Sequence, residues 1–316
     1  MKTPSLKGAA HPREESDLKQ EKSVIDRVTN ELRLARHNWR EHQGRELDLG
    51  SRELPSNQAI HNVVDSLCAI LFPMRLGPPD LTKERENHFV AYSLGTVERE
   101  LVVQTCLELC YADRNQQATE TLRHEAGKLV GDLIGELPAL RRKLDDDVLA
   151  AYSGDPAATC VDEVLISYPG VHALIHHRLA HALYQAGLPI IARIIAEKAH
   201  SATGIDIHPG ATIGRSFFID HGTGVVIGET AVIGDRVRLY QNVTLGAVRF
   251  KEDETGSLTK GEPRHPIVED DVVIYAGATI LGRITIGRAS VIGGNVWLTQ
   301  SVPAESQISQ ASLQQR

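Results

Sequence analysis

The sequence predicts an α+β chain in which an α-helical N-terminal domain is followed by a left-handed parallel β-helix of hexapeptide repeats. Every sixth residue from Ile207 to Val243, and again from Val268 to Leu298, is aliphatic. Residues 201–316 hold 15 of the 26 glycines, and aromatic residues make up only 4% of the chain. A six-residue period suits neither an α-helix nor an alternating strand, but it is typical of a β-helix whose corners need small residues.

The first two hundred residues show helical patterns instead. Residues 1–20 are polar, and we expect them to form a disordered tail. Apolar residues then recur near a 3.6-residue period, which predicts helices at 23–42, 57–72, 84–113, 115–135, 143–152 and, with breaks near Pro169 and Pro189, across 160–200. We therefore assign residues 21–203 to an α-helical domain.

The repeats assign residues 204–300 to the β-helix. Three hexads make one triangular coil, the aliphatic residue of each hexad points inward, and bulky rings are not expected in so narrow a prism. The two runs are out of phase because 25 residues separate Val243 from Val268. The polar segment 248–264 is therefore predicted to be an extruded loop, and residues 301–316 a C-terminal tail.

Composition excludes several classes of protein. The net charge is −7, which argues against nucleic acid as a partner. The N-terminus has no apolar signal region, and no run of 18 apolar residues is present to span a membrane. The four cysteines lack zinc-ribbon spacing. We expect a cytoplasmic protein.

Polar residues that interrupt the repeats are the candidates for chemistry. His221 stands at a predicted corner, and Asp206 precedes it by 15 residues. With 18 residues in a coil, Asp206 would lie three positions away from stacking on His221, so that its carboxylate could reach the imidazole. The pair would then provide a general base and the group that orients it.

Several motifs resemble the serine acetyltransferases, an acyltransferase family. They are IDIHPGATIG (205–214), DHGTGVVIGET (220–230) and RHP (264–266), with GDPAA (154–158) and VHALIHHRLAHALY (171–184) upstream. The resemblance covers roughly residues 150–300. It implies transfer of the acetyl group from acetyl-CoA to the hydroxyl of L-serine, which gives O-acetyl-L-serine and CoA in the first step of cysteine biosynthesis.

The resemblance also assigns roles to individual residues. It makes His221 the general base and Asp206 its orienting carboxylate. It implies that the substrate amino acid is bound by four residues: Asp155, Asp220, Arg264 and His265. Acetyl-CoA, the co-substrate, is expected in the groove between neighbouring β-helices, against the main chain of four small residues: Gly246, Ala247, Ala276 and Gly294.

Further expectations concern partners. The resemblance implies a homotrimer or a dimer of trimers, and feedback inhibition by L-cysteine in the serine site. Many members end in an isoleucine that docks into the sulfhydrylase, the next enzyme of the pathway. This sequence ends in Arg316, so we expect no tight complex of that kind. No metal is expected, although His172, His176, His177 and His181 form two H-x-x-x-H pairs.

Other functions stay open at this point. A hexapeptide-type zinc carbonic anhydrase would need three histidines around zinc, and His208, His221 and His265 are three. An inactive hexapeptide scaffold that binds partners is a second alternative. Acetyl transfer to a sugar is a third, but Asp155, Asp220 and Arg264 favour a zwitterionic amino acid.

Overall fold

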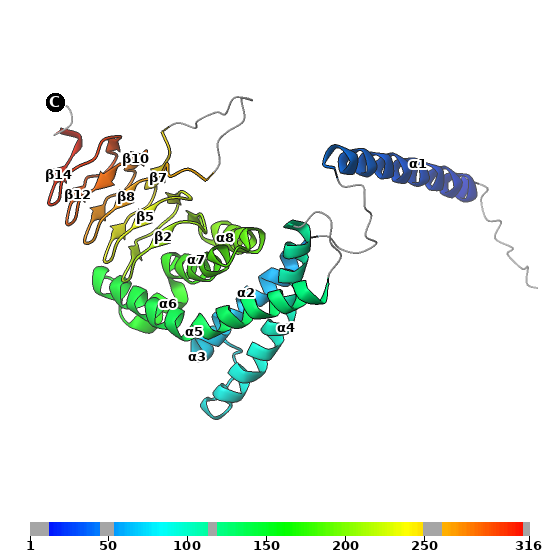
Figure 1. Cartoon of the computed structure of the whole chain (residues 1–316), viewed down its shortest axis with the longest axis horizontal. Helices are drawn as coiled ribbons and strands as arrows, with labels where there is room; N and C mark the ends of the chain where they lie inside the picture. The colour runs from blue at the N-terminus through cyan, green and yellow to red at the C-terminus, as the bar shows by residue number, and fades with distance from the viewer. Residues whose placement is uncertain (1–12, 45–53, 113–118, 249–260, 312–316) are drawn as a thin grey trace, which may run out of the picture. The chain divides into compact units, whose positions relative to one another are not determined.

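The computed structural model describes residues 13–44, 54–112, 119–248 and 261–311. The chain divides into two compact units, residues 1–51 and residues 52–316. The described part of the first unit is mainly one helix, α1 (Arg13–His42) (Figure 1). The helix starts inside the segment 1–20 that we expected to be a disordered tail, since residues 13–20 are helical. Glu, Lys and Gln in this segment are good helix formers, which a low apolar content alone does not reveal.

The second unit begins with the α-helical domain. Its helices pack around a core that includes Ile60, Leu101 and Leu179, each fully buried. The predicted helices 115–135 and 143–152 form one continuous helix that passes through Pro138. The elements are α2 (Asn57–Leu71), α3 (Pro73–Leu76), the 3-10 helix η1 (Lys83–Arg85), α4 (Glu86–Ala112), α5 (Glu120–Gly154), α6 (Val161–Ser167), α7 (Pro169–Gln185) and α8 (Pro189–Thr203).

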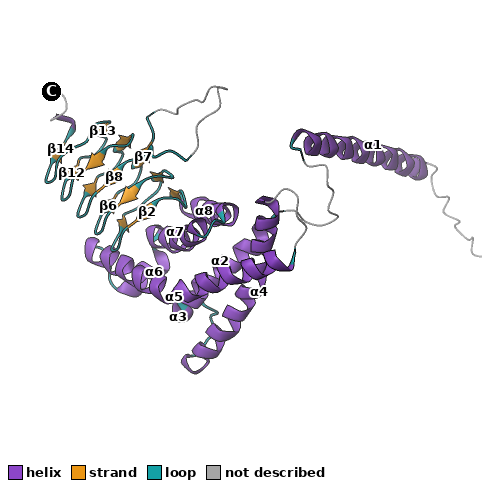
Figure 2. Ribbon diagram, viewed as in Figure 1, coloured by secondary structure: helices purple, strands orange, loops and turns teal. Residues whose placement is uncertain are grey.

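Parallel strands in three sheets follow the helices, which confirms the predicted left-handed parallel β-helix (Figure 2). Sheet A contains β1 (Asp206–Ile207), β4 (Val226–Ile227), β7 (Thr244–Gly246), β10 (Thr279–Leu281) and β13 (Trp297–Leu298). Sheet B contains β2 (Thr212–Ile213), β5 (Val232–Ile233), β8 (Ile267–Val268) and β11 (Thr285–Ile286). Sheet C contains β3 (Phe218–Ile219), β6 (Arg238–Leu239), β9 (Val273–Ile274), β12 (Val291–Ile292) and β14 (Gln307–Ile308).

The sheets meet at three edges of the prism, and the chain passes them in the order A–B, B–C and C–A. Two kinds of aliphatic position point inward. Strand residues such as Ile207 and Ile213 are buried, and so are residues such as Val225 and Ala231, which precede the next strands. Six residues after Ile219, an inward strand residue, the chain reaches Val225, which is also aliphatic and buried but lies at the corner before β4. The sequence alone does not separate these two registers.

The first coil is two residues longer than the second. Asp206 pairs with Val226, twenty residues later, whereas Val226 pairs with Thr244, eighteen residues later. The two extra residues fall at the C–A edge, between β3 and β4, where the chain reads DHGTG. The prediction that Asp206 approaches His221 assumed 18 residues in this coil, and that assumption was wrong. His221 lies five positions, not three, before the residue that stacks on Asp206.

The end of the β-helix also differs from the prediction. Residues 301–316 were assigned to a tail, yet β14 pairs with β12 and Val302 bridges to Ile286. The physical reason is that the last coil is two residues shorter than a regular one. Val291 pairs with Gln307, only sixteen residues later, so Val302 and Ile308 occupy the inward positions. Most of the predicted loop 248–264 lies outside the described residues.

A buried ion pair joins the helical domain to the β-helix. The Arg178 guanidinium donates to both carboxylate oxygens of Asp147, at 2.6 and 2.8 Å, and both side chains are at most 3% exposed. Arg178 also donates to the carbonyls of Ile213 and Gly214. Phe217 fills the end of the prism beside α7, so one bulky ring does fit inside the first coil, contrary to our expectation.

Candidate functional site

The corner that carries His221 bulges out of the β-helix. The regular left-handed position of this edge is Gly224, which stacks closely on Asn242 of the next coil. The longer first coil adds two more left-handed residues, His221 (φ 59°) and Gly222 (φ 87°). The His221 side chain is 70% exposed as a result. An exposed imidazole on a rigid corner can accept a proton from a molecule that binds there.

Two carboxylates lie near this imidazole. Asp220 Oδ1 is 3.8 Å from His221 Nδ1, and the Asp220 side chain is only 12% exposed. Asp155 ends α5, and its carboxylate accepts hydrogen bonds from the Tyr168 hydroxyl at 2.5 Å and from the Ala157 N–H at 2.8 Å. These hydrogen bonds lower the pKa of Asp155, and the nearby charges of Arg238 and His221 lower it further. Asp155 therefore stays ionised at neutral pH.

Arg238 holds the second oxygen of Asp220. Its Nη2 donates to Asp220 Oδ2 at 2.8 Å, and its guanidinium stacks over the rings of Phe218 (4.9 Å) and Tyr240 (4.7 Å). Asp220 thus bridges Arg238 and His221 with one oxygen each. Neither Arg238 nor Tyr168 was among the site residues predicted from the sequence. Tyr168 stands next to an expected helix break, and Arg238 occupies an ordinary outward position of a hexad. The sequence pattern therefore marked neither of them as a site residue.

In the described part of the chain, no hydrogen bond or ion pair joins the Asp206 side chain to this cluster. It is the first residue of β1, just past the C–A edge, and its N–H donates to the carbonyl of Val225. Its neighbour Ile207 is buried, so the Asp206 side chain lies on the outer face of sheet A. Among the described residues, the carboxylate paired with His221 is Asp220 rather than Asp206. The orienting role of Asp206 stays a prediction.

The other predicted substrate residues lie on a different edge. Arg264 and His265 come just before β8 and stack on Glu229 and Thr230, so they belong to the A–B edge. Arg264 Nη2 donates to Glu229 at 2.5 Å, and the Thr230 N–H donates to His265 Nδ1 at 3.1 Å. The His265 ring packs so tightly on Gly228 that a Cβ there would lie 2.1 Å from Nε2. Glycine is therefore required at this position.

The surroundings of His265 decide its protonation. Burial, together with the charge of Arg264, lowers the pKa of His265 to about 4. The imidazole is neutral at pH 7, and because Nδ1 accepts from Thr230, Nε2 carries the hydrogen. His265 is thus prepared to donate a hydrogen bond rather than to accept a proton.

The predicted acetyl-CoA contacts divide between the same two edges. Ala276 and Gly294 stack on each other at the C–A edge, since the Asn295 N–H donates to the Ala276 carbonyl at 2.9 Å. Gly246 ends β7, and Ala247 follows it toward the A–B edge. Each edge of one chain therefore carries half of the predicted site.

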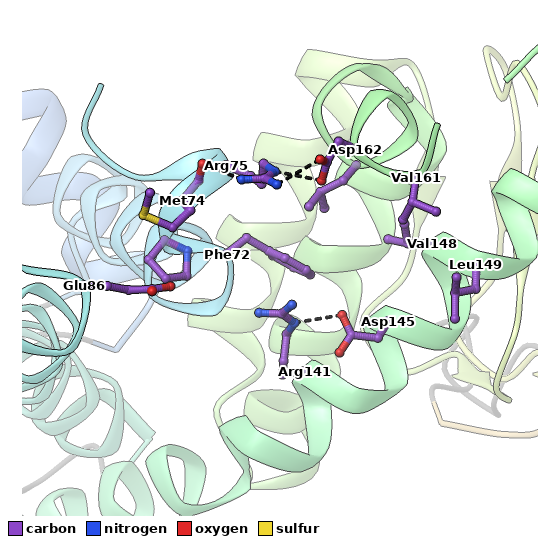
Figure 3. A pocket seen from close by; sticks show the side chains of 12 residues that line it. Phe72, Met74, Arg75, Glu86, Arg141, Asp145, Val148, Leu149, Val161 and Asp162 are labelled. Atoms are coloured by element: carbon purple, nitrogen blue, oxygen red, sulfur yellow. Dashed lines mark hydrogen bonds and ion pairs between the residues drawn. The ribbon is translucent and has the colours of Figure 1, made fainter. Parts of the chain in front are cut away.

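The described part of the second unit contains at least two hollows. One, of about 510 Å³, lies between the end of α5 and sheet C, and Gly154, Phe218 and Arg238 line it. It therefore adjoins the Asp220–Arg238 pair. Figure 3 shows another, of about 370 Å³, within the helical domain, where Arg75 points to Asp162 and Arg141 to Asp145. No predicted site residue lines that second pocket.

The described part of the chain contains no group of three or more His, Cys, Asp or Glu side chains that could hold a metal ion. His176 and His177 are buried in α7, where the ring of His176 lies 4.3 Å from that of His172. Within the described ranges, no helix is long and apolar enough to cross a membrane.

Comparisons with known proteins point to one family. The chain is 56% identical, over 264 residues, to the protein named "Serine acetyltransferase, plasmid" of Synechococcus elongatus, which covers 82% of this chain and 83% of that protein. It is 48% identical over 162 residues to a serine acetyltransferase of Bacillus subtilis, covering 51% of this chain and 70% of the relative. No family model matches the chain.

A solved structure shows the same similarity. The crystal structure of Entamoeba histolytica serine acetyltransferase 1 in complex with L-cysteine superposes with a TM-score of 0.67 at 38% sequence identity. The match covers 78% of this chain and 85% of that one. It extends over more than the β-helix, because residues 204–311 alone are about a third of the chain.

Proposed function

Because the chain belongs to the serine acetyltransferase family, we propose that it transfers the acetyl group of acetyl-CoA to the hydroxyl of L-serine. The products are O-acetyl-L-serine and CoA, and the reaction is the first step of cysteine biosynthesis. The observation that carries the proposal is the C–A edge, where the exposed imidazole of His221 lies beside the carboxylates of Asp155 and Asp220. An imidazole flanked by two carboxylates suits a substrate with an ammonium group next to a hydroxyl.

His221 acts as the general base. It takes the proton from the serine hydroxyl as that oxygen attacks the thioester carbonyl of acetyl-CoA. The tetrahedral intermediate collapses, the C–S bond breaks, and the imidazolium returns the proton to the departing CoA thiolate. Asp155 and Asp220 bind the serine ammonium, while Asp206 orients His221 once the substrates are bound, as the family resemblance implies.

Arg264 and His265 complete the site from a neighbouring subunit. The guanidinium of Arg264 binds the serine carboxylate through two parallel hydrogen bonds, and His265 donates from Nε2. Both lie on the A–B edge, whereas His221 lies on the C–A edge, so one chain does not supply all of them to one substrate. A homotrimer, alone or as half of a dimer of trimers, would place the C–A edge of each subunit against the A–B edge of the next.

Acetyl-CoA lies in the groove between two neighbouring β-helices. Ala276 and Gly294 line it from the subunit that provides His221, and Gly246 and Ala247 line it from the neighbour. Small residues leave the main-chain N–H and C=O groups accessible to a ligand. The rings of Tyr240 and Tyr275 stack on each other at 5.0 Å, and they lie where sheet C meets the C–A edge.

Release of CoA, measured with a thiol reagent, tests the proposal with serine, homoserine and a sugar as acceptors. We expect the highest kcat/KM with serine, and His221→Ala to lower kcat by about 10²–10⁴-fold, with a milder loss for Asp206→Asn. His88→Ala is the matched control, because His88 is exposed on α4 of the helical domain and belongs to neither edge of the β-helix. Near-normal turnover of the His221→Ala variant would refute the assignment.

The same preparation separates the alternatives. Stoichiometric zinc with hydration of CO₂ would favour a hexapeptide-type carbonic anhydrase over acetyl transfer. An inactive scaffold would release no CoA with any acceptor. Acetylation of the sugar in preference to serine would support the third alternative.

Regulation and partners follow from the same site. The Entamoeba histolytica neighbour is described as a complex with L-cysteine. Because cysteine has the ammonium and carboxylate of serine, we propose that it inhibits this enzyme in competition with serine. We also propose that the enzyme is cytoplasmic. Inhibition that serine does not relieve would contradict the shared site.

A further inference from the structure

Among the described residues of its own unit, helix α1 has an apolar face without a partner. Six large apolar side chains on it are strongly exposed, and all but Leu34 lie on one face: Val24 (46%), Ile25 (64%), Val28 (41%), Leu32 (53%), Leu34 (52%) and Trp39 (66%). Every side chain described between residues 24 and 44 is exposed except that of Arg40, which is half-buried. A contiguous apolar stripe of this kind on a soluble protein marks an interaction surface.

The spacing of these residues indicates what covers the stripe. Ile25, Val28, Leu32, Ala35 and Trp39 follow one another at intervals of three, four, three and four residues. This is the alternation of positions a and d in a heptad, which places one narrow seam along the helix. Val24 borders this seam and Leu34 lies outside it. The regular alternation of positions a and d along the rest of the helix favours a second helix of the same kind as the partner.

The charges beside the seam favour a parallel copy. With Ile25, Leu32 and Trp39 at position a, Glu31 occupies position g and Arg36 the following position e. In a parallel coiled coil, position g of one helix faces the next position e of its partner, so Glu31 meets Arg36 of the other copy. Within one helix, residues five apart do not face each other. The intrahelical partner of Glu31 is Arg27, at 3.8 Å between exposed side chains.

We propose that α1 associates with α1 of a second copy of this chain as a parallel coiled coil, with the stripe from Ile25 to Trp39 as its seam. The proposed trimer would supply the copies, but the surface is separate from the catalytic residues. Isolated helices depend on packing for most of their stability, and α1 makes up most of the described part of its unit. Self-association would provide that packing.

Disulfide trapping in the full-length protein tests the seam. Val28→Cys, at position d, brings two thiols face to face in a parallel pair, whereas Asn30→Cys, at position f, directs them to solvent. Both variants carry Cys160→Ser, because Cys160 is an exposed thiol. We expect mild oxidation to form covalent dimers at least about fivefold faster with Val28→Cys than with Asn30→Cys. Equal rates would overturn the proposal, including the case in which α1 packs on another part of its own chain.

A charge exchange tests the parallel register. In the Val28→Cys background, Glu31→Arg places like charges opposite each other and should slow the crosslinking. Adding Arg36→Glu should restore it, even though the intrahelical pair with Arg27 stays broken. Failure of the second change to restore crosslinking would contradict the register. CoA release with serine should not change in any of these variants, so the result is independent of the proposed function.

Discussion

A mixed oligomer can show whether the two halves of the site come from different subunits. One chain would carry His221→Ala on the C–A edge, and the other Arg264→Ala on the A–B edge. Each chain alone should assemble into a nearly inactive protein, because every site lacks either its base or its carboxylate-binding guanidinium. Co-expression with two different tags, followed by purification through both, isolates the mixed oligomers.

The geometry sets the size of the effect. In a cyclic trimer each site takes the C–A edge of one subunit and the A–B edge of the next. If chains mix at random in equal amounts, half of the C–A edges and half of the A–B edges are intact. About a quarter of the sites are then complete, so the mixture should show about a quarter of the wild-type kcat per site. Purification through both tags raises this fraction slightly, because it removes the inactive homotrimers.

A matched pair supplies the control. Wild-type chain is co-expressed with a chain that carries both substitutions. After purification through both tags, sites shared between subunits retain about a sixth of the activity, whereas sites within one chain retain about half. The reasoning would be refuted if the first mixture showed only the summed activity of its two parents. Far-UV circular dichroism checks that the Arg264→Ala chain, which loses the ion pair to Glu229, is folded.

Two predictions concern stability. Arg178→Met leaves the Asp147 carboxylate buried and unpaired, so we expect urea unfolding to show a loss of about 3–5 kcal/mol in the free energy of unfolding. Arg193→Met, whose ion pair is exposed, should lose less than about 0.5 kcal/mol. Similar losses in both variants would contradict the role of the buried pair. Burial lowers the pKa of His176 to about 4, so the unfolded chain binds a proton below pH 6.5 that the folded chain does not. Stability should therefore fall from pH 7.5 to pH 5 by about 2 kcal/mol more in the wild type than in His176→Leu, as measured by urea unfolding at both pH values. Equal pH dependence in the two proteins would show that His176 is not the group responsible.

The six-residue period made the β-helix predictable from sequence because it is a local pattern repeated many times. Each aliphatic residue, from Ile207 to Leu298, faces the same narrow interior, so the pattern and the packing agree. The motif residues near His221 and Arg264 were likewise recognisable by type. Breaks in the period were harder to interpret, because Val302 and Ile308 continue the core after a shift that resembles the start of a tail.

Other features depended on contacts between distant segments. Asp147 stands in a run of three aspartates of the sequence, but it is buried inside α5 and pairs with Arg178. Arg238 looked like an outward-facing strand residue. Its guanidinium stacks over two aromatic rings and donates a hydrogen bond to Asp220. A sequence does not list such partners, because each depends on where two elements meet.

By itself the sequence determined the class of fold, the family and the types of side chain that the reaction needs. Only the tertiary structure decided where those side chains lie. The two extra residues at the C–A edge project His221 from its corner, and the order of the sheets puts Arg264 and His265 on another edge. The reason is physical: a period fixes which residues face the core, whereas the length of each coil decides which outward residues become neighbours.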